Sequence, residues 1–157
     1  NSTQEVKGMT FIKQMLAQIN IDVEVLPMEP ATLNDKIYVD QEEAEVNMWY
    51  VNWSASDFTM DGSVRSLLHS DMVPPTSANT AYFVNEDFDK LLDEGLATAD
   101  PDKQAEIYGE AQTIAWEAAP WLFLGNDQIL YASKSYLSGA YVSPDGAFNF
   151  TNAVLAQ

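Results

Sequence analysis

The order of apolar and polar residues predicts helices that alternate with strands. Residues 4–19 carry apolar side chains every three or four positions, which is the spacing of a helix with one buried face. Asn20 can take the left-handed conformation that closes a helix. Residues 21–25 then alternate between apolar and acidic, as a half-buried strand does. Pro30 suits the first turn of a second helix, which we expect over residues 31–40.

The middle of the chain predicts a buried strand and a short helix. Residues 46–51 are nearly all apolar, a pattern typical of a strand that is covered on both faces in a parallel sheet. A short helix is predicted over residues 61–70. Residues 72–79 contain two adjacent prolines and therefore read as a loop.

Two longer helices are indicated by their N-terminal capping residues. Asn85 precedes two acidic residues and an apolar face, so a helix is expected to begin directly after it. Asp100 caps a further helix with Pro101 in its first turn, and that helix is expected to end near Ala118. The remaining apolar runs predict short strands over residues 121–124 and 129–132.

This alternation favours the α/β class, with a mixed sheet flanked by helices. The length of 157 residues suits one domain with its own core, so we expect residues 1–157 to form a single domain. The first predicted element is a helix whose apolar face needs a sheet. We therefore expect a strand upstream of residue 4 in the gene product.

Composition excludes several classes of function. The chain has 7 basic and 24 acidic residues and a net charge of −17, so it cannot neutralise a phosphate backbone or an anionic membrane surface. It contains no cysteine, which excludes disulfides, zinc–thiolate sites and iron–sulfur clusters. No apolar run reaches the roughly 18 residues of a membrane helix, and residues 1–7 lack the features of a signal peptide.

Catalytic chemistry has little support in the sequence. His69 is the single histidine, and no set of histidines or carboxylates has the spacing of a metal site. Asp57 and Asp61 flank one loop and leave open a hydrolase that uses two carboxylates. A second alternative is a protein-interaction module that uses an exposed sheet edge. We expect no enzyme activity, no cofactor and no metal.

Trp53 is the aromatic residue that points most clearly to a ligand site. We assign Trp49, Trp116 and Trp121 to the core, whereas Trp53 is followed by hydroxyls and a carboxylate in N-W-S-A-S-D. It lies just beyond the predicted strand 46–51, and ligands of open α/β sheets bind beyond the carboxyl ends of strands. A rigid aromatic beside polar donors suits a small polar ligand with an apolar stem.

The chain resembles a known family along most of its length. The stretches that carry the resemblance are F-I-K-Q-M-L-A-Q-I-N-I-D-V-E-V (residues 11–25), W-S-A-S-D (53–57), P-P-T-S-A-N-T-A-Y-F (74–83) and D-P-D-K-Q-A-E-I-Y-G-E-A-Q-T-I-A-W-E-A-A-P-W (100–121). In this order they resemble lobe two, the C-terminal lobe, of the solute-binding proteins that serve ABC importers of peptides, nickel and glutathione (family 5). The last stretch is the most specific of the four.

Within that family the chain is most similar to the glutathione-binding branch, through W-S-A-S and N-T-A-Y-F. The peptide-binding branches carry an Asp three residues after the tryptophan that corresponds to Trp53. Here that position is Ser56, and Asp57 follows it. The departure weakens a simple peptide assignment and is compatible with glutathione.

The resemblance implies one lobe of a type II periplasmic-binding-protein clamshell, a fragment whose N-terminal partner lobe lies elsewhere in the protein. It implies capture of glutathione or a short peptide, delivery to ABC permease subunits, and a bacterial location that is periplasmic or extracellular and membrane-anchored. The ligand-binding residues that it implies are Trp53, Ser54, Ser56, Asp57, Asp61, Arg65, Asn79 and Tyr82. Arg65 would clamp a ligand carboxylate or, as an equal alternative, form a salt bridge at the surface, and Asp57 or Asp61 would pair with an ammonium group.

Overall fold

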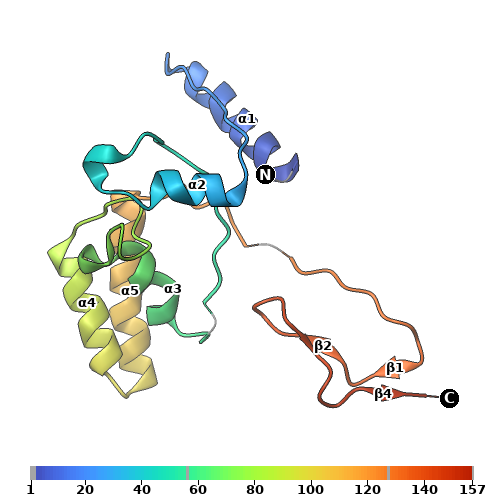
Figure 1. The fold of residues 1–157 in the computed structure, drawn as a ribbon. Helices are drawn as coiled ribbons and strands as arrows, with labels where there is room; N and C mark the ends of the chain where they lie inside the picture. Colours follow the sequence, from blue (N-terminus) through green and yellow to red (C-terminus); the bar gives the residue numbers. More distant parts are fainter. Residues whose placement is uncertain (1–2, 56, 127, 157) are drawn as a thin grey trace.

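A computed structural model describes residues 3–55, 57–126 and 128–156 of the chain. Its body is a group of three helices, α3 (Met60–Leu68), α4 (Glu86–Ala97) and α5 (Pro101–Ala118), which lie side by side in Figure 1. A short 3-10 helix, η2 (Ser70–Met72), follows α3 directly.

The two long helices begin where the capping residues predict. The Asn85 side chain accepts hydrogen bonds from the backbone N–H groups of Asp87 and Phe88, at 3.1 and 2.9 Å. Asp100 caps α5 in the same way, and Pro101 occupies the first helical position. These caps satisfy N–H groups that have no partner inside the helix, so a local sequence signal fixes both helix starts.

The core lies between α4 and α5 and is closed on one side by α3. Phe88 and Leu92 of α4 are 1% and 0% exposed, respectively. They belong to one buried cluster that also contains Leu67, Leu68, Tyr108, Ala111 and Ala115. The small residues of α5 and Gly95 of α4 let the two helices approach closely. The burial of a few large side chains between the helices then stabilises the body.

The N-terminal third forms an arm that contains α1 (Thr3–Ala17), α2 (Pro30–Ile37) and the 3-10 helix η1 (Gln41–Glu43). In Figure 1, α1 projects away from the helical body, and α2 lies at one end of that body. Asn20 has a φ of 62° just after α1, as its sequence position predicts. None of the residues of α1 is buried, and Gly8 faces the ring of Tyr50. Among the described helices, none combines the length and apolarity needed to cross a membrane.

Four two-residue strands lie near the C-terminus, apart from the helical body (Figure 1). β1 (Leu137–Ser138) pairs antiparallel with β4 (Val154–Leu155). β2 (Tyr141–Val142) pairs antiparallel with β3 (Phe148–Asn149) across a turn that contains Pro144, Asp145 and Gly146, where Gly146 has a φ of 85°.

The positions of the predicted strands are wrong. Residues 21–25, 46–51, 121–124 and 129–132 belong to no paired strand within the described part of the chain. Their composition is that of strands, but a strand forms only where a neighbouring segment supplies hydrogen-bond partners. The assignment of Trp116 to the core is also wrong, because its side chain is 67% exposed.

Candidate ligand-binding site

Trp53 and Ser54 lie in the irregular segment that leads into α3. The Trp53 side chain is 46% exposed, and Ser54 is exposed beside it. An indole in this position offers a flat apolar face to solvent, with a hydroxyl within one residue of it. Ser56, which was predicted to belong to the same set, lies outside the described residues.

Asp57 forms the turn that starts α3. Its carboxylate accepts hydrogen bonds from the backbone N–H and the hydroxyl of Thr59, both at 3.0 Å. Thr59 in turn caps the helix by accepting from the Gly62 N–H at 2.9 Å. A Cβ on Gly62 would collide with the Asp57 carboxylate, so a larger residue there would displace that carboxylate. The hydrogen bonds from Thr59 lower the pKa of Asp57, which is therefore ionised near neutral pH and is unsuited to act as a general acid.

Asp61 and Arg65 form an ion pair one turn apart on α3. The Arg65 Nε lies 3.0 and 2.9 Å from the two carboxylate oxygens of Asp61. The Arg65 Nη1 reaches Asp93 of α4 at 2.9 Å. Hydrogen bonding to Asp61 and then to Asp93 raises the pKa of Arg65, against the opposing effect of burial. Arg65 therefore points toward α4 and joins α3 to it.

The two partners of Arg65 differ in their exposure to solvent. The Asp61 side chain is 14% exposed, whereas the Asp93 side chain is 68% exposed. The Tyr108 hydroxyl of α5 lies 3.5 Å from Asp61 Oδ1, so the inner carboxylate contacts two helices. Burial, and then the charge of Asp61, raise the pKa of Tyr108. The outer ion pair with Asp93 is thus the part of this network that a solute can reach.

Asn79 lies at the centre of the loop that precedes α4. Its side chain is fully buried and donates to the carbonyls of His69 and Phe83, at 3.0 and 2.8 Å. Its Oδ1 accepts from the Phe83 N–H at 3.1 Å. Because these bonds go to the backbone, Asn79 holds the loop together in this conformation.

Tyr82 lies in the same loop, with its hydroxyl donating to the Val39 carbonyl at 2.9 Å. Burial, and then the negative charge of Asp40, raise the pKa of Tyr82. The predicted site residues thus divide into two groups. Trp53, Ser54 and Asp57 are exposed, whereas Asp61, Arg65, Asn79 and Tyr82 are partly or fully buried and bond to groups within the chain.

His69, the single histidine, is buried, with 7% of its surface exposed. Its Nδ1 accepts from the Asp71 N–H at 3.1 Å and caps η2. Among the described residues, no group of three or more histidines and carboxylates is placed to hold a metal ion. The described geometry therefore assigns His69 a capping role.

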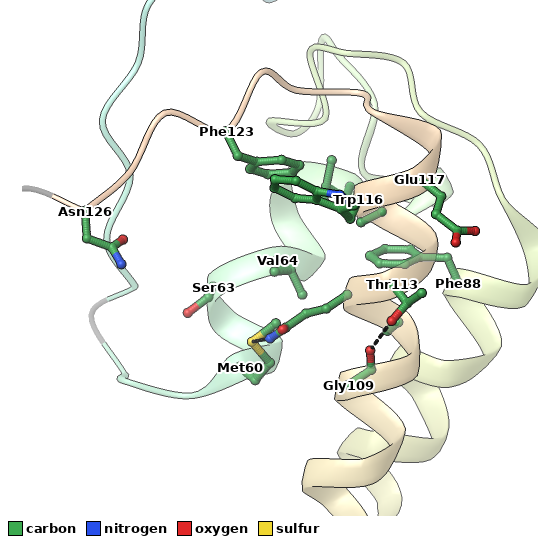
Figure 2. Close-up of a pocket in the computed structure, with 14 residues that line it drawn as sticks. Met60, Ser63, Val64, Phe88, Gly109, Thr113, Trp116, Glu117, Phe123 and Asn126 are labelled. Carbon is green, nitrogen blue, oxygen red and sulfur yellow. Dashed lines mark hydrogen bonds between the residues drawn. The ribbon is translucent and has the colours of Figure 1, made fainter.

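An apolar cavity of about 650 Å³ lies between α3, α5 and residues 121–126 (Figure 2). Met60 and Val64 line it from α3, and Phe88 lies in its floor. Trp116 and Phe123 stack at its rim, with ring centroids 5.8 Å apart and planes at 17°. Sequence reasoning missed this cavity, because its lining comes from segments up to 66 positions apart, and those on α3 and α5 look like ordinary helix faces.

The chain is similar to known proteins in both sequence and structure. No family model matches the chain. The chain is 34% identical over 156 residues to the glutathione-binding protein GsiB of Salmonella choleraesuis (strain SC-B67), and 33% identical to that of Escherichia coli (strain K12). Each alignment covers 99% of this chain and 30% of the relative, so the chain spans about a third of the length of the relatives that it matches.

A solved structure shows the same fold. The clavulanic acid biosynthesis oligopeptide binding protein 2 superposes with a TM-score of 0.83 at 22% sequence identity. The match covers 93% of this chain and 28% of that protein. It confirms the α/β lobe predicted from the sequence, although the strand positions differ from the prediction. The similar proteins are binding proteins by name, which agrees with a non-catalytic role.

Proposed function

We propose that this chain acts in the capture of a small peptide-like solute for an ABC importer. The proposal rests on its homology to part of a solute-binding protein of the peptide-, nickel- and glutathione-binding family. The observation that carries the proposal is the similarity to the glutathione-binding proteins over 156 residues. In this proposal residues 1–157 are one lobe of a clamshell, and capture takes place in the periplasm or outside a bacterial membrane.

The exposed residues beside the start of α3 are proposed to meet the ligand first. Trp53 would stack on an apolar or peptide plane of the ligand, as its exposed indole face allows. Ser54 and Ser56 would bond amino or carboxyl groups. Asp57 would attract an ammonium group, since its carboxylate is exposed and its pKa is lowered.

Arg65 is proposed to bind a ligand carboxylate through its outer edge. Its Nε is held by Asp61, but its Nη1 pairs with Asp93, whose side chain is 68% exposed. A ligand carboxylate can replace Asp93 on Nη1 without breaking the inner pair. Glutathione and short peptides both carry such a carboxylate. Asp61 then orients the guanidinium. Asn79 and Tyr82 hold the conformation of the loop that precedes α4.

The rest of the binding protein is proposed to cover the apolar surface that this chain exposes. The chain has an accessible surface of 11,450 Å². A compact monomer of 17.4 kDa would expose about 7,900 Å² by the usual scaling of area with mass. The rim aromatics of the cavity and the unpaired extended segments contribute to this excess. A partner lobe and adjoining strands of the same protein are suited to cover it, and ABC permease subunits would then receive the loaded protein.

The test is calorimetric titration of the longer protein that carries this sequence with reduced glutathione, a dipeptide and a tetrapeptide. Micromolar or tighter binding of glutathione alone is expected for the glutathione-binding branch. Binding of the peptides instead would keep the solute-binding role and change the ligand. Absence of binding by all three would contradict the proposed solute class.

The 157-residue chain alone serves as the matched control. It presents one wall of a two-walled site, so its affinity for the same ligands is expected to be weak or undetectable. Tight binding by the chain alone would show that the second lobe is not needed. Sedimentation of the chain alone tests the alternative of an interaction module. That alternative requires a dimer whose fraction rises with protein concentration.

A further inference from the structure

The segment that carries Trp53 is fixed at two points. At its far end, the Asp57–Thr59 turn joins it to the first turn of α3. At its near end, the Tyr82 hydroxyl donates to the Val39 carbonyl at 2.9 Å, across 43 positions of sequence. Ile37, two residues before Val39, is the buried residue of α2. The N-terminal arm is therefore held to the loop before α4 close to Val39.

Tyr82 is itself held firmly by Asn79. The Tyr82 N–H donates to the Asn79 carbonyl at 3.0 Å, and Tyr82 adopts a φ of 51°. Asn79 binds the backbone of Phe83 on both its donor and acceptor sides and is completely buried. A tyrosine in the left-handed region needs such support, because that conformation is unfavourable for a residue with a Cβ. The phenol thus projects from a loop that buried hydrogen bonds hold in place.

Residues 40–55, between the two fixed points, have few other constraints. They contain one short 3-10 helix, η1, an exposed ion pair from Glu45 to Lys36 at 3.0 Å, and the ring of Tyr50, which faces Gly8 of α1. Most of their residues are exposed or half-buried, without strand pairing in the described part of the chain. The placement of such a segment depends on how its ends are held.

We propose that Tyr82 is a positioning residue, whose hydroxyl holds the Val39 carbonyl and thereby places the segment that carries Trp53. This role differs from direct contact with the ligand. Its consequence for ligand affinity rests on the proposed function, whereas its consequence for the order of residues 38–55 does not.

The first test is hydrogen–deuterium exchange of the 157-residue chain with Tyr82→Phe, which removes only the hydroxyl. Exchange of the hydrogen-bonded amides in residues 38–55, those of Tyr38, Glu43 and Ala44, is expected to become about three- to tenfold faster, the range that corresponds to one net hydrogen bond. Exchange in α4 and α5 is expected to stay unchanged. Tyr131→Phe is the matched control, because Tyr131 is also a tyrosine in an irregular segment and is 54% exposed.

Two outcomes of this experiment would overturn the proposal. Unchanged exchange over residues 38–55 would mean that the hydroxyl does not hold the segment. Equal acceleration in α4 and α5 would mean that Tyr82 supports the whole body and has no specific effect on the segment.

The second test is titration of the longer protein with reduced glutathione, using the same two variants. Tyr82→Phe is expected to weaken binding about three- to tenfold and Tyr131→Phe to leave it unchanged. Unchanged affinity with faster exchange would overturn the link to the site, and weaker affinity with unchanged exchange would make Tyr82 a direct ligand contact. If the unaltered protein does not bind glutathione, the proposed ligand fails, while the exchange experiment still decides the role of Tyr82.

Discussion

Gly95 of α4 faces the ring of Tyr108 of α5 so closely that a Cβ on Gly95 would lie 2.7 Å from the Tyr108 Cζ. Tyr108 is buried, and its hydroxyl lies near Asp61, so the ring has little room to move. Gly95→Ala is therefore expected to lower the free energy of unfolding by about 1–3 kcal/mol, as overpacked cores do. Urea denaturation followed by circular dichroism measures this change.

Gly109 provides the matched control for that substitution. It also lies inside a helix, but a Cβ there would meet no atom within 4 Å. Gly109→Ala is expected to raise stability by about 0.5–1 kcal/mol, since alanine favours the helix over glycine. Equal effects of the two substitutions would contradict the close approach of α4 and α5.

Asn79→Asp replaces a buried amide by a group of the same shape that cannot donate. The carbonyls of His69 and Phe83 would lose their donors and face a carboxylate. The free energy of unfolding is expected to fall by at least about 2 kcal/mol at neutral pH. Asn47→Asp, at an exposed position, is the control and is expected to change stability by less than about 0.5 kcal/mol.

The lowered pKa of Asp57 predicts that the first turn of α3 loses stability in acid. Its pKa is lowered by the hydrogen bonds from Thr59, so the stabilising effect of the carboxylate is present above the unfolded-state value of about 3.9 and is lost as the pH falls through the lower folded-state pKa. The Thr59 amide resonance is expected to titrate in that acidic range. The titration should be absent in Asp57→Asn, and its persistence there would show that another group causes it.

The raised pKa values of Tyr82 and Tyr108 predict that the folded chain loses stability in alkaline solution. Burial raises the pKa of both phenols, so the neutral form is favoured in the folded chain. Their contribution is complete below the unfolded-state value of about 10 and is lost as the pH rises through the higher folded-state pKa. Urea unfolding between about pH 8 and 11 should show this decline. Each Tyr→Phe variant should flatten part of it, and a profile unchanged in both variants would refute the assignment.

Trp53→Ala in the longer protein tests the proposed ligand contact. Loss of the exposed indole is expected to weaken binding of the cognate ligand at least tenfold, about 1.4 kcal/mol. Leu96→Ala removes another exposed apolar side chain, on α4, and should leave affinity unchanged. Calorimetry in which Trp53→Ala binds as tightly as the unaltered protein would remove Trp53 from the site.

The helices could be predicted because their signals are local. Asn85 and Asp100 bond to N–H groups two and three residues away, so the sequence window that contains the cap also contains its partners. The predicted strands failed for the opposite reason. A run such as residues 46–51 has the composition of a strand, but its pairing depends on segments that are remote in the sequence.

The surroundings of the predicted site residues could be read from the sequence only in part. The polar surroundings of Trp53 indicated an exposed aromatic, and its side chain is indeed exposed. The direction of Arg65 could not be read from its neighbours, because one of its partners, Asp93, lies 28 positions away on another helix. The same limit applies to Tyr82, whose acceptor is a backbone carbonyl that no sequence pattern marks.

The stacked aromatics at the end of α5 give the chain a built-in optical reporter. Phe123 stacks with Trp116 and with Trp121, at centroid distances of 5.8 and 6.4 Å. Trp116 is largely exposed, so its fluorescence emission should resemble that of an indole in water. Burial of these stacked aromatic rings by another part of the protein would move the Trp116 emission to shorter wavelength and reduce its quenching by acrylamide. Assembly with the partner lobe proposed above can therefore be followed in solution without attaching a label.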